Sequence, residues 1–219
     1  MSATPEEVEA GHAFYTKRSL ALYDVAILGF FSRVAWRCPA DRIIGHYDQH
    51  VSGNHLDIGV GTGYFLDHCR FPTATPRIAL LDPNATCLDV ASDRVARFDP
   101  EVIQADILQP LAYAGDRFDS IGMNYVLHCL PGDFTVKGRV LDHLRPLASP
   151  GAVLFGATLL HDGVERNWFA RSVMARNNKH RIFCNATDSL SGLREMLESR
   201  LADITVDVIG CVATFAARF

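Results

Sequence analysis

The stretch "HLDIGVGTGYF", residues 55–65, places three glycines at alternate positions directly after a short apolar run that contains Asp57. Because glycine has no Cβ, its backbone adopts dihedral angles that other residues avoid and can lie close to a ligand. An apolar run, a glycine loop and then a helical pattern are typical of the first strand, turn and helix of an α/β sheet. The stretch therefore predicts a ligand site at the carboxyl ends of parallel strands.

Short apolar runs alternate with helical patterns on both sides of this loop and down the chain to residue 160. Such alternation predicts a mostly parallel sheet with helices on both faces, and two adjacent strand-like runs at the end predict an antiparallel hairpin at the sheet edge. The predicted strands are 55–58, 77–82, 101–106, 118–126, 152–160, 204–210 and 211–219, and the predicted helices include 6–37, 64–69, 84–98 and 136–148. The sequence Ser149-Pro150-Gly151 is expected to separate the last of these helices from the fifth strand.

The composition is typical of a soluble enzyme, with 48% apolar and 21% charged residues among 219. The formal net charge of −4 argues against a nucleic-acid partner. The apolar run at 19–36 is interrupted by Asp24 and Arg33, so we expect no membrane span, and the start "MSATPEEVEAGH" lacks the apolar core of a secretory signal. Six cysteines without a C-x-x-C pair indicate free thiols in a reducing cytoplasm and no metal site. Homodimer formation is left open.

Two ligand classes compete for the glycine loop. Dinucleotides require G-x-G-x-x-G, but Tyr64 stands at the place of the third glycine. Asp57 beside the loop would repel a phosphate and favours a cationic group, such as an α-amino group. The loop therefore indicates a nucleoside ligand with a positive end rather than a nicotinamide dinucleotide.

Five segments in order and spacing resemble the class I S-adenosylmethionine-dependent methyltransferases. They are "LDIGVGTGYFL", "ALLDPN", "QADILQP", "FDSIGMNYVLHCL" and "LRPLASPGAVLFGATLL", which together cover about residues 54–160, and "IGCVATFAARF" fits the reversed last strand of that family. The resemblance implies a Rossmann-like α/β sandwich, with a mostly parallel seven-stranded sheet whose last strand is antiparallel. It also implies S-adenosyl-L-methionine as cofactor.

The resemblance divides one methyltransferase domain, 1–219, into four parts. We expect an N-terminal helical cap at 1–52, a cofactor-binding core at 53–160, a substrate-cap insertion at 161–186, and a last helix with the C-terminal hairpin at 187–219.

Roles for individual residues follow from the same resemblance. Asp57 would hold the amino end of the cofactor, Asp82 would accept both ribose hydroxyls, and Asp106 would accept from the adenine amino group. The remaining cofactor residues are expected to be Gly59, Gly61 and Gly63 at the methionine and ribose, Ile107, Pro83 and Asn84 at the adenine, and Asn124 and Tyr125 beneath the methionine. Taken singly, Asp82 and Asp106 could equally be helix caps or surface charges.

The acceptor side is less determined. His128, which we expect to share a helix face with Asn124, is either a general base or a side chain that only packs. Tyr15 and Tyr23 are expected to close over the cofactor, as similar tyrosines in the family do. The cap aromatics Phe30, Phe31, Trp36, Trp168 and Phe169, with His161 and Met174, would cover a planar apolar acceptor, although Phe30 and Phe31 are more readily explained as core.

These observations favour a cytoplasmic methyltransferase that moves a methyl group to a small-molecule acceptor, in keeping with secondary metabolism. The acceptor atom is left open among oxygen, nitrogen, carbon and sulfur. One alternative is a catalytically inactive methyltransferase-like module that binds the cofactor and regulates. Another is a nicotinamide-dependent oxidoreductase, which Tyr64 disfavours.

Overall fold

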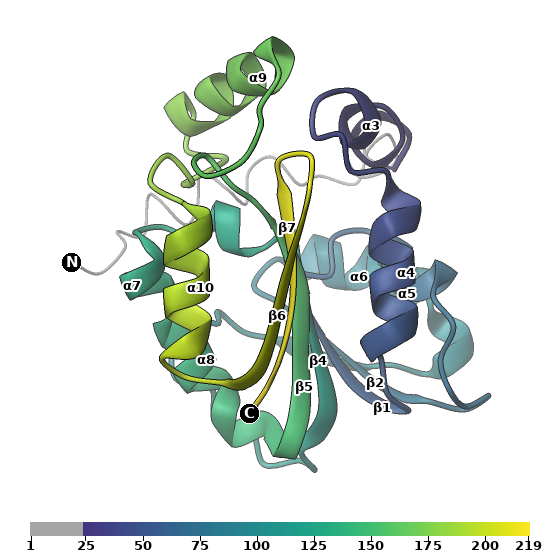
Figure 1. Ribbon diagram of the computed structural model, residues 1–219. Helices are drawn as coiled ribbons and strands as arrows, with labels where there is room; N and C mark the ends of the chain where they lie inside the picture. Colours follow the sequence, from purple (N-terminus) through teal and green to yellow (C-terminus); the bar gives the residue numbers. More distant parts are fainter. Residues whose placement is uncertain (1–23) are drawn as a thin grey trace.

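Seven strands form one mixed sheet in the computed structural model, which describes residues 24–219 (Figure 1). The strands are β1 (Asn54–Ile58), β2 (Arg77–Asp82), β3 (Glu101–Gln104), β4 (Phe118–Asn124), β5 (Ala148–Leu159), β6 (Ala202–Ile209) and β7 (Val212–Arg218). Their order is β3-β2-β1-β4-β5-β7-β6, and β7 alone runs against the others. The predicted fold class is confirmed.

Helices cover both faces of this sheet (Figure 1). One face carries α4 (Ala40–His50), α5 (Tyr64–His68) and α6 (Ala85–Arg94), and the other carries α7 (Phe134–Lys137), α8 (Arg139–Leu144) and α10 (Leu190–Glu198). Adjacent residues of β5 serve the two layers, since Leu154 packs in the cluster of α8 and α10 while Phe155 packs in that of α4 and α6. The two-residue period of a strand thus builds two cores from one sheet.

Short helical turns lie between several of the longer elements. One helix that the sequence predicts as continuous is broken into three pieces. The turns are η2 (Ala96–Phe98), η3 (Leu127–Cys129) and η4 (Arg145–Leu147). The helix predicted over 136–148 is therefore wrong in its continuity, since α7, α8 and η4 occupy this region. Pro146 has no backbone N–H and cannot continue an α-helix, and here it lies in the tight turn η4.

The boundaries of two predicted strands are also corrected. β5 begins at Ala148 and passes through Ser149-Pro150-Gly151, where a break was expected. The pairing of Ala148 with Phe118 and a register irregularity just after it accommodate these residues within the strand. β3 ends at Gln104, so Asp106 lies in the loop beyond the strand rather than at its end.

A cap covers the carboxyl ends of the strands and is built from two distant segments (Figure 1). The first contains η1 (Asp24–Phe31) and α3 (Ser32–Val34), and the second contains α9 (Trp168–Lys179). The rings of Phe31 and Phe169 stack with centroids 5.6 Å apart, and Asn167 Nδ2 donates to the Val34 carbonyl at 2.8 Å. These contacts join the two segments into one cover.

The burial of the aromatic side chains in the cap differs in part from the expectation. Phe30 is 55% exposed and Trp168 is 80% exposed, so the assignment of Phe30 to the core is wrong. Met174 is fully buried in the core, whereas Phe31 is half-buried. Tyr15 and Tyr23 lie outside the described residues.

Candidate cofactor and acceptor site

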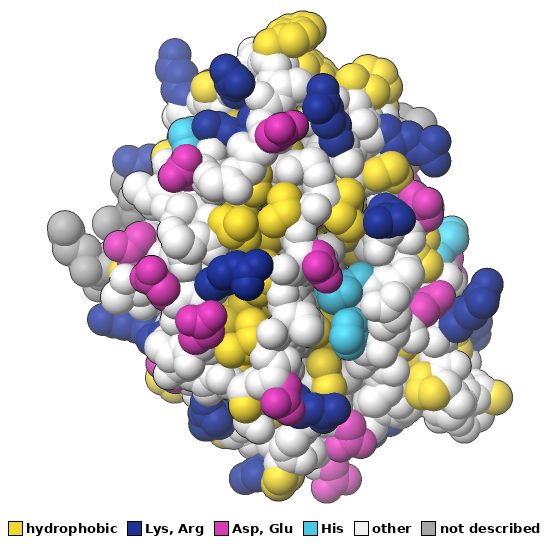
Figure 2. Space-filling model, viewed as in Figure 1, with side chains coloured by type: hydrophobic (Ala, Val, Ile, Leu, Met, Phe, Trp, Pro, Cys, Tyr) yellow, Lys and Arg dark blue, Asp and Glu magenta, His cyan; other side chains and the backbone are white. Residues whose placement is uncertain are grey.

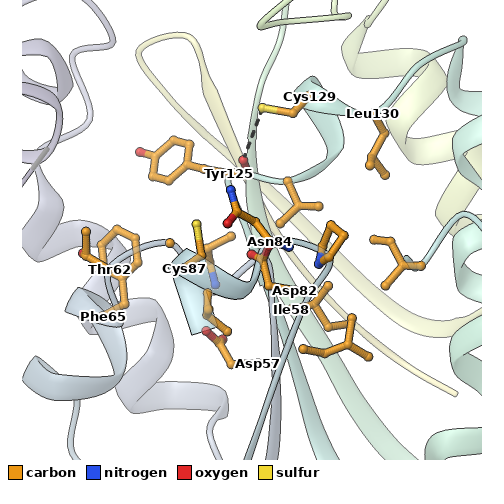
Figure 3. A pocket seen from close by; sticks show the side chains of 18 of the residues that line it. Asp57, Ile58, Thr62, Phe65, Asp82, Asn84, Cys87, Tyr125, Cys129 and Leu130 are labelled. Carbon is orange, nitrogen blue, oxygen red and sulfur yellow. Dashed lines mark hydrogen bonds between the residues drawn. The ribbon is translucent and has the colours of Figure 1, made fainter. Parts of the chain in front are cut away.

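A cavity lies at the carboxyl ends of β1, β2 and β4, beside the glycine loop (Figure 3). Every cofactor residue expected from the sequence lines it. These are Asp57, Gly59, Gly61, Gly63, Asp82, Pro83, Asn84, Asp106, Ile107, Asn124 and Tyr125. The parallel strands therefore bring four separate sequence segments to one place, although the roles of the individual residues stay predictions.

The glycine loop needs glycine for two different reasons. Gly59, Gly61 and Gly63 all have positive φ, at 66°, 54° and 71°. A Cβ on Gly63 would lie 3.1 Å from the Ala91 backbone, so this glycine also lets α6 pack closely. A Cβ on Gly61 would meet no atom of the described residues within 4 Å, which leaves its backbone open to the cavity on that side. Gly61 therefore provides the close backbone approach that a ligand requires.

Asp57 is buried and held in place from α4. The Tyr47 hydroxyl donates to Asp57 Oδ1 at 2.7 Å, and His55 Nε2 lies 3.5 Å from the same oxygen. Burial, followed by the charge of Asp57, raises the pKa of Tyr47 well above its usual value, so Tyr47 stays a donor. A Cβ on Gly122, which pairs with Asp57 in register, would lie 2.7 Å from Asp57 Oδ1, so this glycine leaves the carboxylate its room.

Asp82 ends β2 beside the same cavity. The residue is 8% exposed, and its Oδ1 accepts from the Asn84 N–H at 2.8 Å. Burial raises the pKa of Asp82 to about 6, and the backbone N–H groups of Asn84 and Val60 oppose this shift. Hydroxyl donors from a bound ligand would compensate the buried charge.

The adenine end of the predicted site lies in the loops after β2 and β3. Asp106 Oδ1 accepts from the Leu108 N–H at 2.9 Å, so one carboxylate oxygen stabilises its own loop. Ile107 is buried and lines the cavity. Asn84 caps α6 by accepting from the Thr86 N–H at 2.9 Å, which commits its side-chain oxygen to the helix.

Asn124 and Tyr125 lie where β4 leaves the sheet. Asn124 is buried, and neither of its amide atoms has a hydrogen-bond partner of normal geometry among the described residues. Tyr125 has a φ of 58°, which is rare for a bulky residue, and its N–H donates to the Ala157 carbonyl at 2.7 Å. An unsatisfied buried amide and a strained backbone at one cavity are the features expected of a binding site.

The charged side chains that line the cavity favour one class of ligand. Asp57, Asp82 and Asp106 line it, and no Lys, Arg or His of the described residues does so. Three carboxylates without a cation would repel a pyrophosphate and attract a positively charged ligand. The lining therefore fits a sulfonium nucleoside with an amino group better than a dinucleotide.

A second cavity of about 530 Å³ lies under the cap. It shares Leu28, Tyr125 and Ile182 with the first cavity, so the two adjoin. Its other lining residues are Phe31, Ser32, Trp36, His128, Leu159, Phe169, Ser172, Val173, Arg176, Asn177 and Phe183. The volume and the aromatic lining suit one small planar molecule.

His128 lines this second cavity but not the first. The expectation that it shares a helix face with Asn124 is wrong, because Asn124 ends β4 and His128 lies in the turn η3. The ring is 3% exposed, and its Nδ1 has no hydrogen-bond partner among the described residues. Burial, and then the charge of Lys137, lowers the pKa of His128 to about 3, so the ring is neutral at physiological pH.

Several residues of the site carry no recognisable signal in the sequence. Tyr47 comes from a helix that the pattern places only in the cap, and Leu28 and Ile182 come from two segments that meet in space alone. Gly122 becomes meaningful only through its register with Asp57. Tertiary pairing rather than local sequence defines these four positions.

The described residues contain no group of three His, Cys, Asp or Glu side chains arranged to hold a metal ion. Within the same part of the chain, no helix is both long and apolar enough to cross a membrane.

Comparison with known proteins agrees with this geometry. Residues 37–200 match a family model described as a methyltransferase domain. Demethylluteothin O-methyltransferase of Streptomyces thioluteus is 38% identical over 97% of this chain and 92% of its own length, and the physcion biosynthesis cluster O-methyltransferase of Aspergillus chevalieri is 36% identical over 95% of each. The solved DhpI-SAH complex has a TM-score of 0.72 at 15% identity and covers 99% of this chain and 98% of that one, which shows a shared fold.

The family match spans most of the chain, the relatives cover nearly all of it, and the cavity at the strand ends carries the charges that the cofactor requires. The chain belongs to the methyltransferase family and is a class I S-adenosylmethionine-dependent methyltransferase of the small-molecule type.

Proposed function

We propose that this protein transfers a methyl group to a hydroxyl oxygen of a planar, aromatic small molecule of secondary metabolism. The observation that carries the proposal is the 530 Å³ cavity under the cap, which we call the acceptor cavity. It adjoins the cavity at the strand ends, which we call the cofactor cavity, through Leu28, Tyr125 and Ile182. Its aromatic walls suit a ring system. The relatives named as O-methyltransferases support oxygen as the acceptor atom.

The chain's contribution on the donor side is binding and orientation. S-adenosylmethionine supplies an electrophilic methyl group on a positively charged sulfur. Asp57 would accept from the amino group, Asp82 from the ribose hydroxyls and Asp106 from the adenine amino group. The open amide of Asn124 would satisfy its hydrogen bonds on the methionine part.

On the acceptor side, His128 would orient the hydroxyl. A ring with a pKa of about 3 is neutral and is a weak base, so it accepts or donates a hydrogen bond rather than storing a proton. The acceptor hydroxyl would release its proton to water as its oxygen takes the methyl group and S-adenosylhomocysteine leaves, and alignment of the oxygen with the methyl group would supply most of the rate.

Two thiols at the cofactor cavity must not compete for the methyl group. Cys87 and Cys129 both line this cavity, and burial raises the pKa of each thiol to about 12. The thiolate, not the thiol, is the nucleophile. Both sulfurs therefore stay protonated and inert at physiological pH.

The experiment is a product analysis with S-adenosylmethionine that carries a trideuterated methyl group. The purified protein is incubated with matched aryl alcohols, anilines and thiols that share one ring system, and the products are read by mass spectrometry. We expect labelled methyl ethers and no labelled amines. Asp82→Ala should reduce labelling at limiting S-adenosylmethionine. Labelling of the amines instead would overturn the oxygen assignment, and absence of any labelling would favour the inactive module.

Location and assembly belong to the same proposal. The protein is proposed to act in the cytoplasm, without a nucleic-acid partner, as the net charge of −4 supports. Light scattering would decide between monomer and homodimer.

A further inference from the structure

The two adjoining cavities carry opposite charge. The cofactor cavity is lined by Asp57, Asp82 and Asp106 with no cationic side chain among the described residues. In the lining of the acceptor cavity, Arg176 is the one charged side chain that the described residues supply, since His128 is neutral. The polarity thus reverses from the donor side to the acceptor side.

Arg176 reaches the acceptor cavity from α9. Phe169, Ser172, Val173, Arg176 and Asn177 all line the cavity and recur at the three- and four-residue spacing of one helix face. This face presents two apolar side chains, a hydroxyl, an amide and one guanidinium.

Arg176 has no carboxylate partner among the described residues. It therefore keeps all five of its N–H donors for other partners. Arg171 provides a contrast on the same helix, because it does not line the cavity and its Nε donates to the Arg166 carbonyl at 3.0 Å.

The cap as a whole is basic although the chain is acidic. Residues 24–37 and 161–186 together contain seven Lys and Arg but three Asp and Glu, in a chain of net charge −4. Figure 2 shows Lys and Arg side chains gathered over α3 and α9, at the top of the view. A local excess of one sign raises the concentration of oppositely charged ligands at the entrance.

We infer that the acceptor is an anionic aryl compound, whose negatively charged group pairs with Arg176 while its ring packs on Phe169 and Phe31. This inference rests on the proposed function, since it names the class of molecule that the acceptor cavity takes. A guanidinium can bind a carboxylate or a similar planar anion through two parallel hydrogen bonds, which fixes the orientation of the ring. A neutral aryl compound would form no such pair, and the exposed guanidinium would stay hydrated.

The test uses two fluorescent probes that differ in one group. Anilinonaphthalenesulfonate carries a sulfonate, and anilinonaphthalene has the same ring system without it. Their affinities are measured by fluorescence titration on the full chain with S-adenosylhomocysteine bound. The variants are Arg176→Met, which keeps the length of the side chain, and Arg171→Met as the matched control on the same helix.

We expect the wild-type protein to bind the sulfonated probe about five- to tenfold more tightly than the neutral one, in a salt-dependent manner. Arg176→Met should remove this preference and leave the affinity for the neutral probe unchanged. Arg171→Met should keep the preference for the sulfonated probe, and Phe169→Ala should weaken the binding of both probes.

Three results would overturn the inference. They are equal affinity of the wild type for the two probes, an unchanged preference for the sulfonated probe in Arg176→Met, or a loss of this preference in Arg171→Met as large as that in Arg176→Met. Failure of the inference and failure of the proposed function remain distinguishable. If the neutral aryl alcohols are methylated while the probes bind equally, the transferase activity stands and the anionic acceptor does not. If neither probe binds, the cavity is not an aryl site.

Discussion

Lys137 and Asp188 form an ion pair in which neither side chain has any exposed surface, with Lys137 Nζ 2.6 Å from Asp188 Oδ2. The same ammonium donates to the Cys184 carbonyl at 3.0 Å, and the Cys184 N–H donates to the His128 carbonyl at 2.7 Å. The pair therefore fixes the loop that lies behind His128 and beside Phe183 in the acceptor cavity. Burial lowers the pKa of Lys137, and the contact with Asp188 opposes this.

Removal of one partner of this pair should destabilise the fold strongly. Lys137→Met leaves a buried carboxylate uncompensated, and we expect a loss of about 3–5 kcal/mol in the free energy of unfolding, measured by urea denaturation at neutral pH. The double variant Lys137→Met with Asp188→Leu should recover much of the loss. A loss below about 1 kcal/mol in the single variant would contradict the buried pairing.

Asp82 should make cofactor affinity depend on pH. Its raised pKa of about 6 means that the carboxylate accepts ribose hydroxyls fully above that value and loses its charge as the pH falls below it. We expect the affinity for S-adenosylhomocysteine to be flat from about pH 7 upward and to fall below about pH 6. Calorimetry on Asp82→Asn should show weaker binding without this fall. An identical pH profile in the variant would exclude Asp82 as its source.

His128 should make stability, rather than turnover, depend on pH. Its pKa is about 3 in the folded protein and about 6.5 when unfolded, so the unfolded chain binds the proton more tightly. This contribution to stability is complete above about pH 6.5 and is lost as the pH falls toward 3, by about 2 kcal/mol at pH 5. His128→Gln should flatten that part of the curve, and an unchanged slope between pH 6.5 and 5 would contradict the buried neutral ring.

An ion pair holds the first described segment against the glycine loop. Arg94 Nη2 lies 2.6 Å from Asp24 Oδ2, and Thr62 Oγ1 donates to Asp24 Oδ1 at 2.7 Å. Arg94→Ala should speed S-adenosylhomocysteine dissociation severalfold, because Leu28 of this segment lines both cavities, while stability changes by about 1 kcal/mol or less. Stopped-flow displacement measures the rate.

Arg97→Ala is the matched control for this measurement. Arg97 pairs with Asp67 at 2.5 Å, close to Arg94 in sequence but away from the cofactor cavity. S-adenosylhomocysteine should dissociate from Arg97→Ala at the wild-type rate. Equal rates in all three proteins would show that the Asp24 contact does not retain the cofactor.

The sequence predicts the donor side of the site well because strand periodicity is a local property. Once β1 and β2 are recognised as parallel, Asp57 and Asp82 must lie at the same edge of the sheet, and the structure places both at one cavity with Asp106. The enzyme class and the cofactor were expected from the family resemblance of the motifs that contain these residues.

The acceptor side depends on long-range contacts that no local pattern encodes. Tyr125, with a φ of 58°, turns the chain away from β4 directly after its N–H has bonded the Ala157 carbonyl of β5. His128 therefore lies in a separate turn and shares no helix face with Asn124. Ser149-Pro150-Gly151 likewise reads as a break, but the pairing of Ala148 with Phe118 of β4 keeps these residues within β5. Tertiary pairing overrides local propensity at both places.

We place the cofactor of this methyltransferase in the cavity at the strand ends. Calorimetry with S-adenosylhomocysteine and with NAD, on the wild type and on Asp82→Ala, tests this placement. We expect one site for S-adenosylhomocysteine, no heat with NAD, and an affinity about 30- to 150-fold weaker in Asp82→Ala, which corresponds to about 2–3 kcal/mol. Binding of NAD without S-adenosylhomocysteine, or wild-type affinity in Asp82→Ala, would contradict it.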